Sequence, residues 1–112
     1  MVTATEVSPG DIFEAFLYEQ KSRGRTEWKR YNKKVHRAFY DAKKEFPDLM
    51  DAYDFLLRTE PYSHTLNSMH QEFRQAKILA LVDENVVVRN PELLKEPSKE
   101  LRAVARYICD RV

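Results

Sequence analysis

The order of elements in residues 60–90, "EPYSHTLNSMHQEFRQAKILALVDENVVVRN", constrains the fold more than any other feature of the chain. Ser63 is a good helix N-cap. Apolar residues then recur at the spacing of one helix face: Leu66, Met69, Phe73 and Ala76. Two β-rich runs follow, on either side of residues 83–85, whose Asp, Glu and Asn tolerate turns. This stretch therefore predicts a polar helix from Ser63 that leads directly into a β-hairpin.

The sequence before this stretch predicts two long helices. Ser8 and Pro9 are typical of a helix start, and Gly24 can adopt the left-handed conformation that ends a helix. Thr26 can cap a second helix that runs to near Pro47. Its apolar residues recur at spacings of three and four and are expected in the core: Trp28, Tyr31, Val35, Phe39, Ala42 and Phe46.

Shorter elements are expected around the remaining prolines. Pro47 can start a short helix, and residues 53–59 either continue this helix or form a short strand. Pro91 predicts a short helical turn after the hairpin. Ser98 can cap a last helix, which has an apolar face: Leu101, Val104, Ala105, Ile108 and Val112.

Together these elements predict one domain over residues 1–112, mainly α-helical with one β-hairpin, in which residues 1–7 form a flexible arm. The order is typical of a winged helix with additional N- and C-terminal helices. Its helix-turn-helix core would consist of the helix from Thr26, the short helix after Pro47 and the helix from Ser63. The hairpin would then be the wing.

Residues 46–90 resemble the middle of the Panacea antitoxin group of small bacterial and archaeal proteins. Members of that group have an aromatic F-x-F segment, a G-P-Y-S turn, a helix with spaced leucines and a short hairpin. Tyr53 and Phe55 stand at the aromatic segment of this chain, and Glu60 replaces the glycine of the turn. Three residues match the rest of the turn: Pro61, Tyr62 and Ser63. The resemblance implies a winged-helix-like fold, a protein- or DNA-binding role and no catalytic residues.

The composition argues against an enzyme. With only two glycines, the chain has no phosphate-binding loop and no dinucleotide fingerprint. Its three histidines, His36, His64 and His70, are too scattered for a local metal motif. Cys109 is the only cysteine, which excludes an intramolecular disulfide and a cysteine-based zinc site. We therefore predict no catalytic residue, no metal and no cofactor.

The sequence also indicates a cytoplasmic protein that does not enter membranes. No apolar run approaches the length of a membrane span, and the N-terminus lacks a basic-then-apolar secretion signal. A single cysteine fits a reducing compartment.

Positive charge is concentrated in one segment, although the net charge of the chain is only +1. Residues 23–44 contain nine Lys and Arg residues against two acidic ones, and acidic segments flank them. Such a segment is either an anion-binding face or a solvated helix face.

The exposed side of the helix from Ser63 has residue types that read DNA bases, because Asn and Gln pair with adenine edges and Arg with guanine edges. The residues predicted to face bases are Asn67, His70, Gln71 and Arg74. Phosphate contacts supply much of the affinity for DNA. The residues predicted to make them are Lys29, Lys33, Lys34, Arg37 and Arg89. We therefore predict a transcriptional regulator that binds double-stranded DNA as a homodimer.

A protein-interaction module, such as an antitoxin-like neutraliser, is the alternative. The first and last helices both have apolar stripes, which a partner subunit could cover. The same stripes could instead close the core of a single chain of this size.

Overall fold

The computed structural model describes residues 7–30, 32–57 and 59–112. These residues form four α-helices, five β-strands and one 3-10 helix. Their order is α1 Pro9–Ser22, β1 Glu27–Lys29, α2 Lys33–Glu45, β2 Leu56–Leu57, β3 Pro61–Tyr62, α3 His64–Gln75, β4 Leu79–Val82, β5 Asn85–Val88, η2 Pro91–Leu93 and α4 Lys99–Cys109. The prediction of a mainly helical domain with a β-hairpin is confirmed. Residues 1–6 of the predicted arm lie outside the described residues, whereas Val7 is buried against the core.

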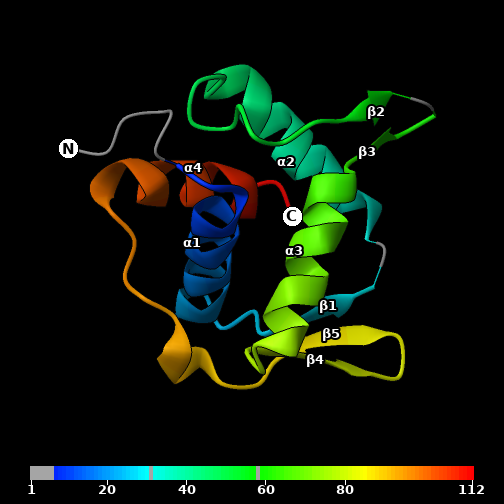
Figure 1. The fold of residues 1–112 in the computed structure, drawn as a ribbon, viewed down its shortest axis with the longest axis vertical. Coiled ribbons are helices and arrows are strands. Elements are labelled where there is room, and N and C mark those ends of the chain that lie inside the picture. The colour runs from blue at the N-terminus through cyan, green and yellow to red at the C-terminus, as the bar shows by residue number, and fades with distance from the viewer. Residues whose placement is uncertain (1–6, 31, 58) are drawn as a thin grey trace.

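Helix α1 lies near the centre of the molecule, with α4 across one of its ends and α3 beside it (Figure 1). Strands β1, β5 and β4 form an antiparallel sheet in that order, at the C-terminal end of α3. Strands β2 and β3 form a second, smaller hairpin at the N-terminal end of α3, and both hairpins extend to the same side of the molecule. None of the helices in the described ranges is long and apolar enough to cross a membrane.

Hydrogen bonds confirm three predicted helix starts. Ser8, Ser63 and Ser98 each accept at the side-chain oxygen from the backbone N–H three residues later, at 3.1, 3.1 and 3.3 Å. At the first of these, the Asp11 carboxylate also accepts from the Ser8 N–H at 3.0 Å, which completes a capping box. Gly24 has a φ of +74°, as predicted for the residue that ends α1.

The prediction of one long helix from Thr26 is wrong. Strand β1 takes the place of its first turns, and α2 starts only at Lys33, where Asn32 is the N-cap. Trp28 pairs with Val86 of β5, and its side chain is buried between sheet and helices. Pairing with a segment far along the chain therefore overrides the helical periodicity of the local sequence.

The predicted short helix after Pro47 is also wrong, so the three-helix core is not built as predicted. Residues 46–52 form successive turns, and the chain then enters β2, which confirms the alternative of a short strand. Met50 and Tyr53 are nevertheless fully buried, and the Tyr53 hydroxyl donates to the Pro9 carbonyl at 2.7 Å. The segment thus contributes two core side chains without forming a helix.

The predicted hairpin is confirmed and belongs to a larger sheet. Strand β4 pairs with β5 through a turn in which Asp83 has a φ of +57°, and β1 pairs with the other side of β5. Residues opposite one another in this register point to the same face of the sheet. The face towards the helices is formed by Trp28, Leu79, Leu81, Val86 and Val88.

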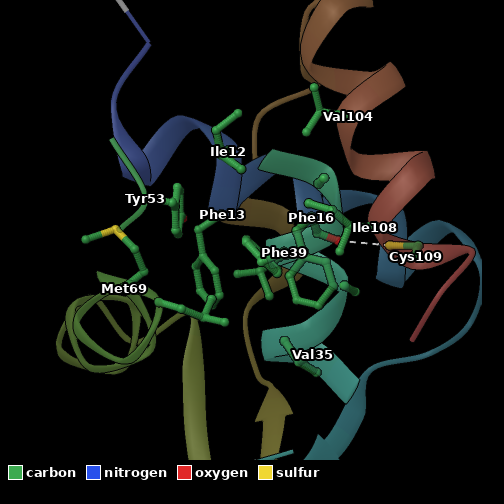
Figure 2. Close-up of a cluster of buried hydrophobic side chains, with 14 of the residues drawn as sticks. Ile12, Phe13, Phe16, Val35, Phe39, Tyr53, Met69, Val104, Ile108 and Cys109 are labelled. Carbon is green, nitrogen blue, oxygen red and sulfur yellow. Dashed lines mark hydrogen bonds between the residues drawn. The ribbon is translucent and has the colours of Figure 1, made fainter. Parts of the chain in front are cut away.

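Two phenylalanines of α1 lie at the centre of the core (Figure 2). The Phe16 ring centroid is 5.1 Å from that of Phe39 in α2 and 5.6 Å from that of Trp28 in β1. The Phe13 ring is 4.9 Å from Phe73 of α3. Side chains of α2, α3 and the sheet therefore pack against side chains of α1. Of the predicted core residues, Tyr31 lies outside the described residues.

Helix α4 packs on α1, and polar contacts join the two. The buried carboxylate of Glu19 lies 3.8 Å from Arg102 Nε, and the Arg25 guanidinium donates to the Cys109 and Val112 carbonyls at 2.9 and 3.0 Å. The Cys109 thiol is buried and donates to the carbonyl of Phe16 at 3.8 Å (Figure 2). The apolar stripes that suggested a homodimer thus cover each other within one chain, and the dimer stays a prediction.

Candidate binding cleft

Helix α3 has an apolar side towards the core and a polar side towards the sheet and α2. Leu66 and Met69 are buried, whereas Ala76, the last residue of the predicted apolar seam, is exposed at the helix end. The neighbouring side of the helix lines a cleft: Asn67, Gln71 and Arg74.

The turn at Pro61–Ser63 fixes the start of α3 on α2. The Tyr62 ring stacks on His36 with a centroid distance of 5.0 Å and an interplanar angle of 11°. The Ser63 N–H donates to His36 Nδ1 at 3.1 Å, and Asn67 Nδ2 donates to the Tyr62 hydroxyl. The residues that match the G-P-Y-S turn therefore position the polar side of α3.

The α3–sheet cleft consists of two adjoining hollows that share Gln71, Arg74 and Leu81. The inner hollow, of about 220 Å³, is bounded by α3, the start of α2 and the sheet. Its lining contains three cations, three amides, three rings and three aliphatic side chains: Lys29, Arg30, Arg74, Asn32, Asn67, Gln71, Trp28, His36, His70, Val35, Leu81 and Val86. The outer hollow is more open and adds the following residues: Gln75, Lys77, Leu79, Ala80, Arg89 and Asn90.

Cations, and no acidic residues, line the part of the cleft that the structure describes. Its lining includes five cations: Lys29, Arg30, Arg74, Lys77 and Arg89. Within residues 7–30, 32–57 and 59–112, no Asp or Glu lines either hollow. Four of these cations also form no ion pair with any carboxylate that the structure describes: Lys29, Arg74, Lys77 and Arg89. A contiguous surface of this kind attracts anions, even though the whole chain is nearly neutral.

Six of the nine residues predicted to contact DNA line this cleft, from three separate segments: Lys29, Asn67, His70, Gln71, Arg74 and Arg89. The other three, Lys33, Lys34 and Arg37, line a different hollow that also contains two carboxylates. The Arg37 guanidinium lies 3.7 Å from Asp41 and 3.8 Å from Glu60. Two carboxylates partly offset the charge of this second surface, which also includes Arg111, so we do not group it with the cleft.

The structure adds Trp28, Asn32 and Lys77 to the residues predicted from the sequence. Trp28 and Asn32 reach the cleft because β1 pairs with β5, and no local pattern encodes that pairing. Lys77 has a φ of +69°, where the chain leaves α3 and turns into β4.

His70 is held by other core groups, which does not favour its predicted role in base contact. Its Nε2 accepts from Trp28 Nε1 at 3.3 Å, and its Nδ1 is 2.9 Å from the Leu66 carbonyl, to which it donates. The ring also packs edge-on against Phe13, with a centroid distance of 4.7 Å. Burial lowers the pKa of His70 to about 4. The side chain is therefore neutral at pH 7 and supports α3 and β1.

Acidification is expected to destabilise the fold through this histidine. The folded-state pKa of His70 lies below its ordinary value of 6.5, and burial lowers the pKa of His36 as well. The unfolded chain then binds more protons below pH 6.5, so the free energy of unfolding falls as the pH drops from 6.5 towards 4. Between pH 7.5 and pH 5, His70 alone accounts for roughly 2 kcal/mol of this loss.

Urea denaturation at several pH values measures this effect. His70→Gln is expected to flatten the dependence between pH 6.5 and pH 5, because it removes one proton-binding group from the unfolded state. An unchanged pH dependence in His70→Gln would show that other groups cause the loss.

The cleft combines cations, amides and aromatic edges, which suits the binding of an anion with planar groups. Within the described ranges, no group of three or more His, Cys, Asp and Glu residues is arranged to hold a metal ion. No protein-family model matches the chain, and comparisons with curated proteins and with solved structures give no match either. The resemblance to the Panacea antitoxin group therefore stays a prediction.

Proposed function

We propose that the protein binds double-stranded DNA in the α3–sheet cleft, as a winged-helix-like regulator. The observation that carries this proposal is a set of four cations from β1, α3 and the residues that flank the hairpin, with no carboxylate in the described lining of the cleft: Lys29, Arg74, Lys77 and Arg89. Phosphate neutralisation by Lys and Arg supplies the sequence-independent part of DNA affinity. These four residues are therefore the proposed phosphate contacts.

Gln71 and Gln75 are the residues best placed to contact base edges, because both are exposed on α3. Glutamine pairs with adenine in the major groove. Arg74, predicted from the sequence to face bases, lines the two hollows at their junction and is one of the proposed phosphate contacts. Asn67 is less available than its position in the sequence suggests, because its amide already donates to Tyr62. We accordingly assign Asn67 and His70 to the support of α3.

The order of elements also supports a winged-helix arrangement. Helix α3 is followed at once by the β4–β5 hairpin, and β1, from the segment between α1 and α2, completes the sheet. The turn of the hairpin contains Asp83 and Glu84, which phosphates would repel. Contacts from this wing are therefore expected from Arg89 at its base and not from its tip.

Fluorescence anisotropy with a labelled duplex of mixed sequence tests the proposal. At physiological salt we expect saturable binding with a Kd between about 1 and 100 µM, the range of sequence-independent binding, and tighter binding to a preferred site. Absence of binding at roughly 100 µM protein in low salt would overturn the proposal.

Self-association is the second candidate, and the β2–β3 hairpin is the observation that favours it. Leu56 and Leu57 are 45% and 66% exposed, on a hairpin that projects from the helices (Figure 1). Their side chains point to opposite faces of the short strand, so a partner that wraps the hairpin would bury both. A second copy of the chain could cover them.

Sedimentation velocity distinguishes a dimer from a monomer. If the hairpin is a dimer contact, the wild-type chain dimerises at high concentration, and the variant with Leu56→Ser and Leu57→Ser remains monomeric. Both side chains are exposed, so the substitutions should change the free energy of unfolding by less than about 0.5 kcal/mol. A monomeric wild-type chain would contradict this role for the hairpin.

A further inference from the structure

We propose that the inner hollow of the α3–sheet cleft binds a small carboxylate with a compact apolar body. This site goes beyond the proposed contacts to DNA. A DNA backbone is a wide, continuous polyanion, so it can lie across the mouth of the hollow without filling the interior. The interior, of about 220 Å³, has cationic, amide and apolar side chains, and its size suits a small ligand.

Part of the wall of the hollow is apolar. Leu81 of β4 and the Trp28 ring line it beside polar side chains, whereas Val35 and Val86 are almost completely buried and contribute little surface. The Trp28 ring is fixed by its hydrogen bond to His70 at 3.3 Å. A volume of about 220 Å³ equals roughly seven water molecules at about 30 Å³ each, which leaves room for one substituted six-membered ring. Displacement of water from such walls by an apolar ring is favourable.

The lining also contains groups that bind a carboxylate. Lys29 and Arg74 form no ion pair with a carboxylate in the part of the chain that the structure describes. An arginine can hold a carboxylate through two parallel hydrogen bonds. The Asn32 side-chain oxygen already accepts from the Lys34 N–H at 2.8 Å, so its amide NH2 is the group left to donate. The carboxylate of a ligand would thus meet cations and an amide, and its body would meet Leu81 and the Trp28 ring.

Such a ligand would compete with DNA, because Arg74 and Gln71 belong to both sites. This regulatory consequence rests on the proposed function. Binding of the carboxylate itself does not, and it can be measured on the protein alone. Failure of one proposal is therefore distinguishable from failure of the other.

Three probes of one shape and different charge test the site: cyclohexanecarboxylate, cyclohexanecarboxamide and cyclohexylmethylamine. Trp28 is the only tryptophan in the chain, so its fluorescence reports on this hollow. We expect a saturable change with the carboxylate, with a Kd of the order of 1 mM. The amide should bind at least about tenfold more weakly, and the amine should give no saturable signal. Each titration is repeated by calorimetry, which detects binding even if the fluorescence of Trp28 does not change.

Two variants and a control locate the binding. Arg74→Gln removes the proposed carboxylate partner, and Leu81→Phe fills the hollow, so each should weaken binding by at least about tenfold. Arg37→Gln makes the same chemical change on the surface of the other hollow and should leave Kd unchanged within about twofold. Thermal unfolding confirms that each variant is folded. Equal responses to the three probes, no response to the carboxylate, or equal losses in Arg74→Gln and Arg37→Gln would overturn the proposal.

Discussion

Reversal of two charges in the α3–sheet cleft, Arg74→Glu together with Arg89→Glu, is expected to weaken binding to duplex DNA by at least about 100-fold at low salt. Each substitution removes a proposed phosphate contact and places a carboxylate beside the DNA backbone. Arg74 is half-buried at the junction of the two hollows, and Arg89 is exposed at the base of the hairpin. Neither residue forms an ion pair with a described carboxylate, so the fold should tolerate both changes. Fluorescence anisotropy measures the loss, and circular dichroism checks the fold.

The matched control reverses Lys33 and Lys34, which are exposed and line the other hollow. Neither side chain lines the cleft, so their reversal removes no proposed phosphate contact, and salt at about 0.1 M screens their remaining effect on DNA. The control variant should therefore retain its affinity within about threefold at that salt concentration. Similar losses in the two double variants would show that overall charge, and not the cleft, determines binding.

Phe16→Ala is expected to lower the free energy of unfolding by about 3 to 5 kcal/mol. The Phe16 side chain is completely buried, and its ring contacts rings of α1, β1 and α2: Phe13, Trp28 and Phe39. Truncation leaves a cavity where these elements meet, and the surrounding rings cannot collapse into it without moving the sheet. Since a small domain has a stability of about 5 to 15 kcal/mol, this loss is a large part of the total.

Urea denaturation measures the effect, and Leu57→Ala is its control. The Leu57 side chain is 66% exposed on the β2–β3 hairpin, so its truncation should cost less than about 0.5 kcal/mol. A cost below about 1 kcal/mol for Phe16→Ala would contradict the central position of this ring in the core.

The predictions that rest on local chemistry agree with the structure. The caps at Ser8, Ser63 and Ser98 depend only on a side-chain oxygen and an N–H three residues later, and Gly24 needs only its own backbone freedom. The hairpin could be predicted because β-rich runs flank a turn of Asp, Glu and Asn.

The two failures depend on distant partners. Trp28 stands seven residues before Val35, an apolar position of α2, and this spacing is typical of one helix face, yet its partner is Val86 in β5. Met50 and Tyr53 are as buried as the core residues of a helix would be. Their segment is instead held in place by long-range contacts, such as the hydrogen bond from the Tyr53 hydroxyl to the Pro9 carbonyl. A local sequence window contains none of these contacts, so its periodicity alone could not separate a helix from buried turns or a strand.

The same distinction applies to the cleft. The polar side of α3 follows from helical spacing, so Asn67, Gln71 and Arg74 could be predicted from the sequence. Strand β1 brings Lys29 to the cleft, whereas Lys33 and Lys34, only a few residues further along the chain, line another hollow. Strand pairing and helix packing determine which cations line the cleft, and the composition of the chain does not predict this.

The salt dependence of DNA binding tests the central claim most directly. If three or four cations of the cleft contact phosphates, log Kd should rise with log salt concentration with a slope of about 2.7 to 3.6, at about 0.9 per contact. Arg74→Gln should lower that slope by about 0.9, while Arg37→Gln should leave it unchanged. A slope near zero, or the same slope in the wild type and Arg74→Gln, would show that the α3–sheet cleft is not where the protein meets DNA.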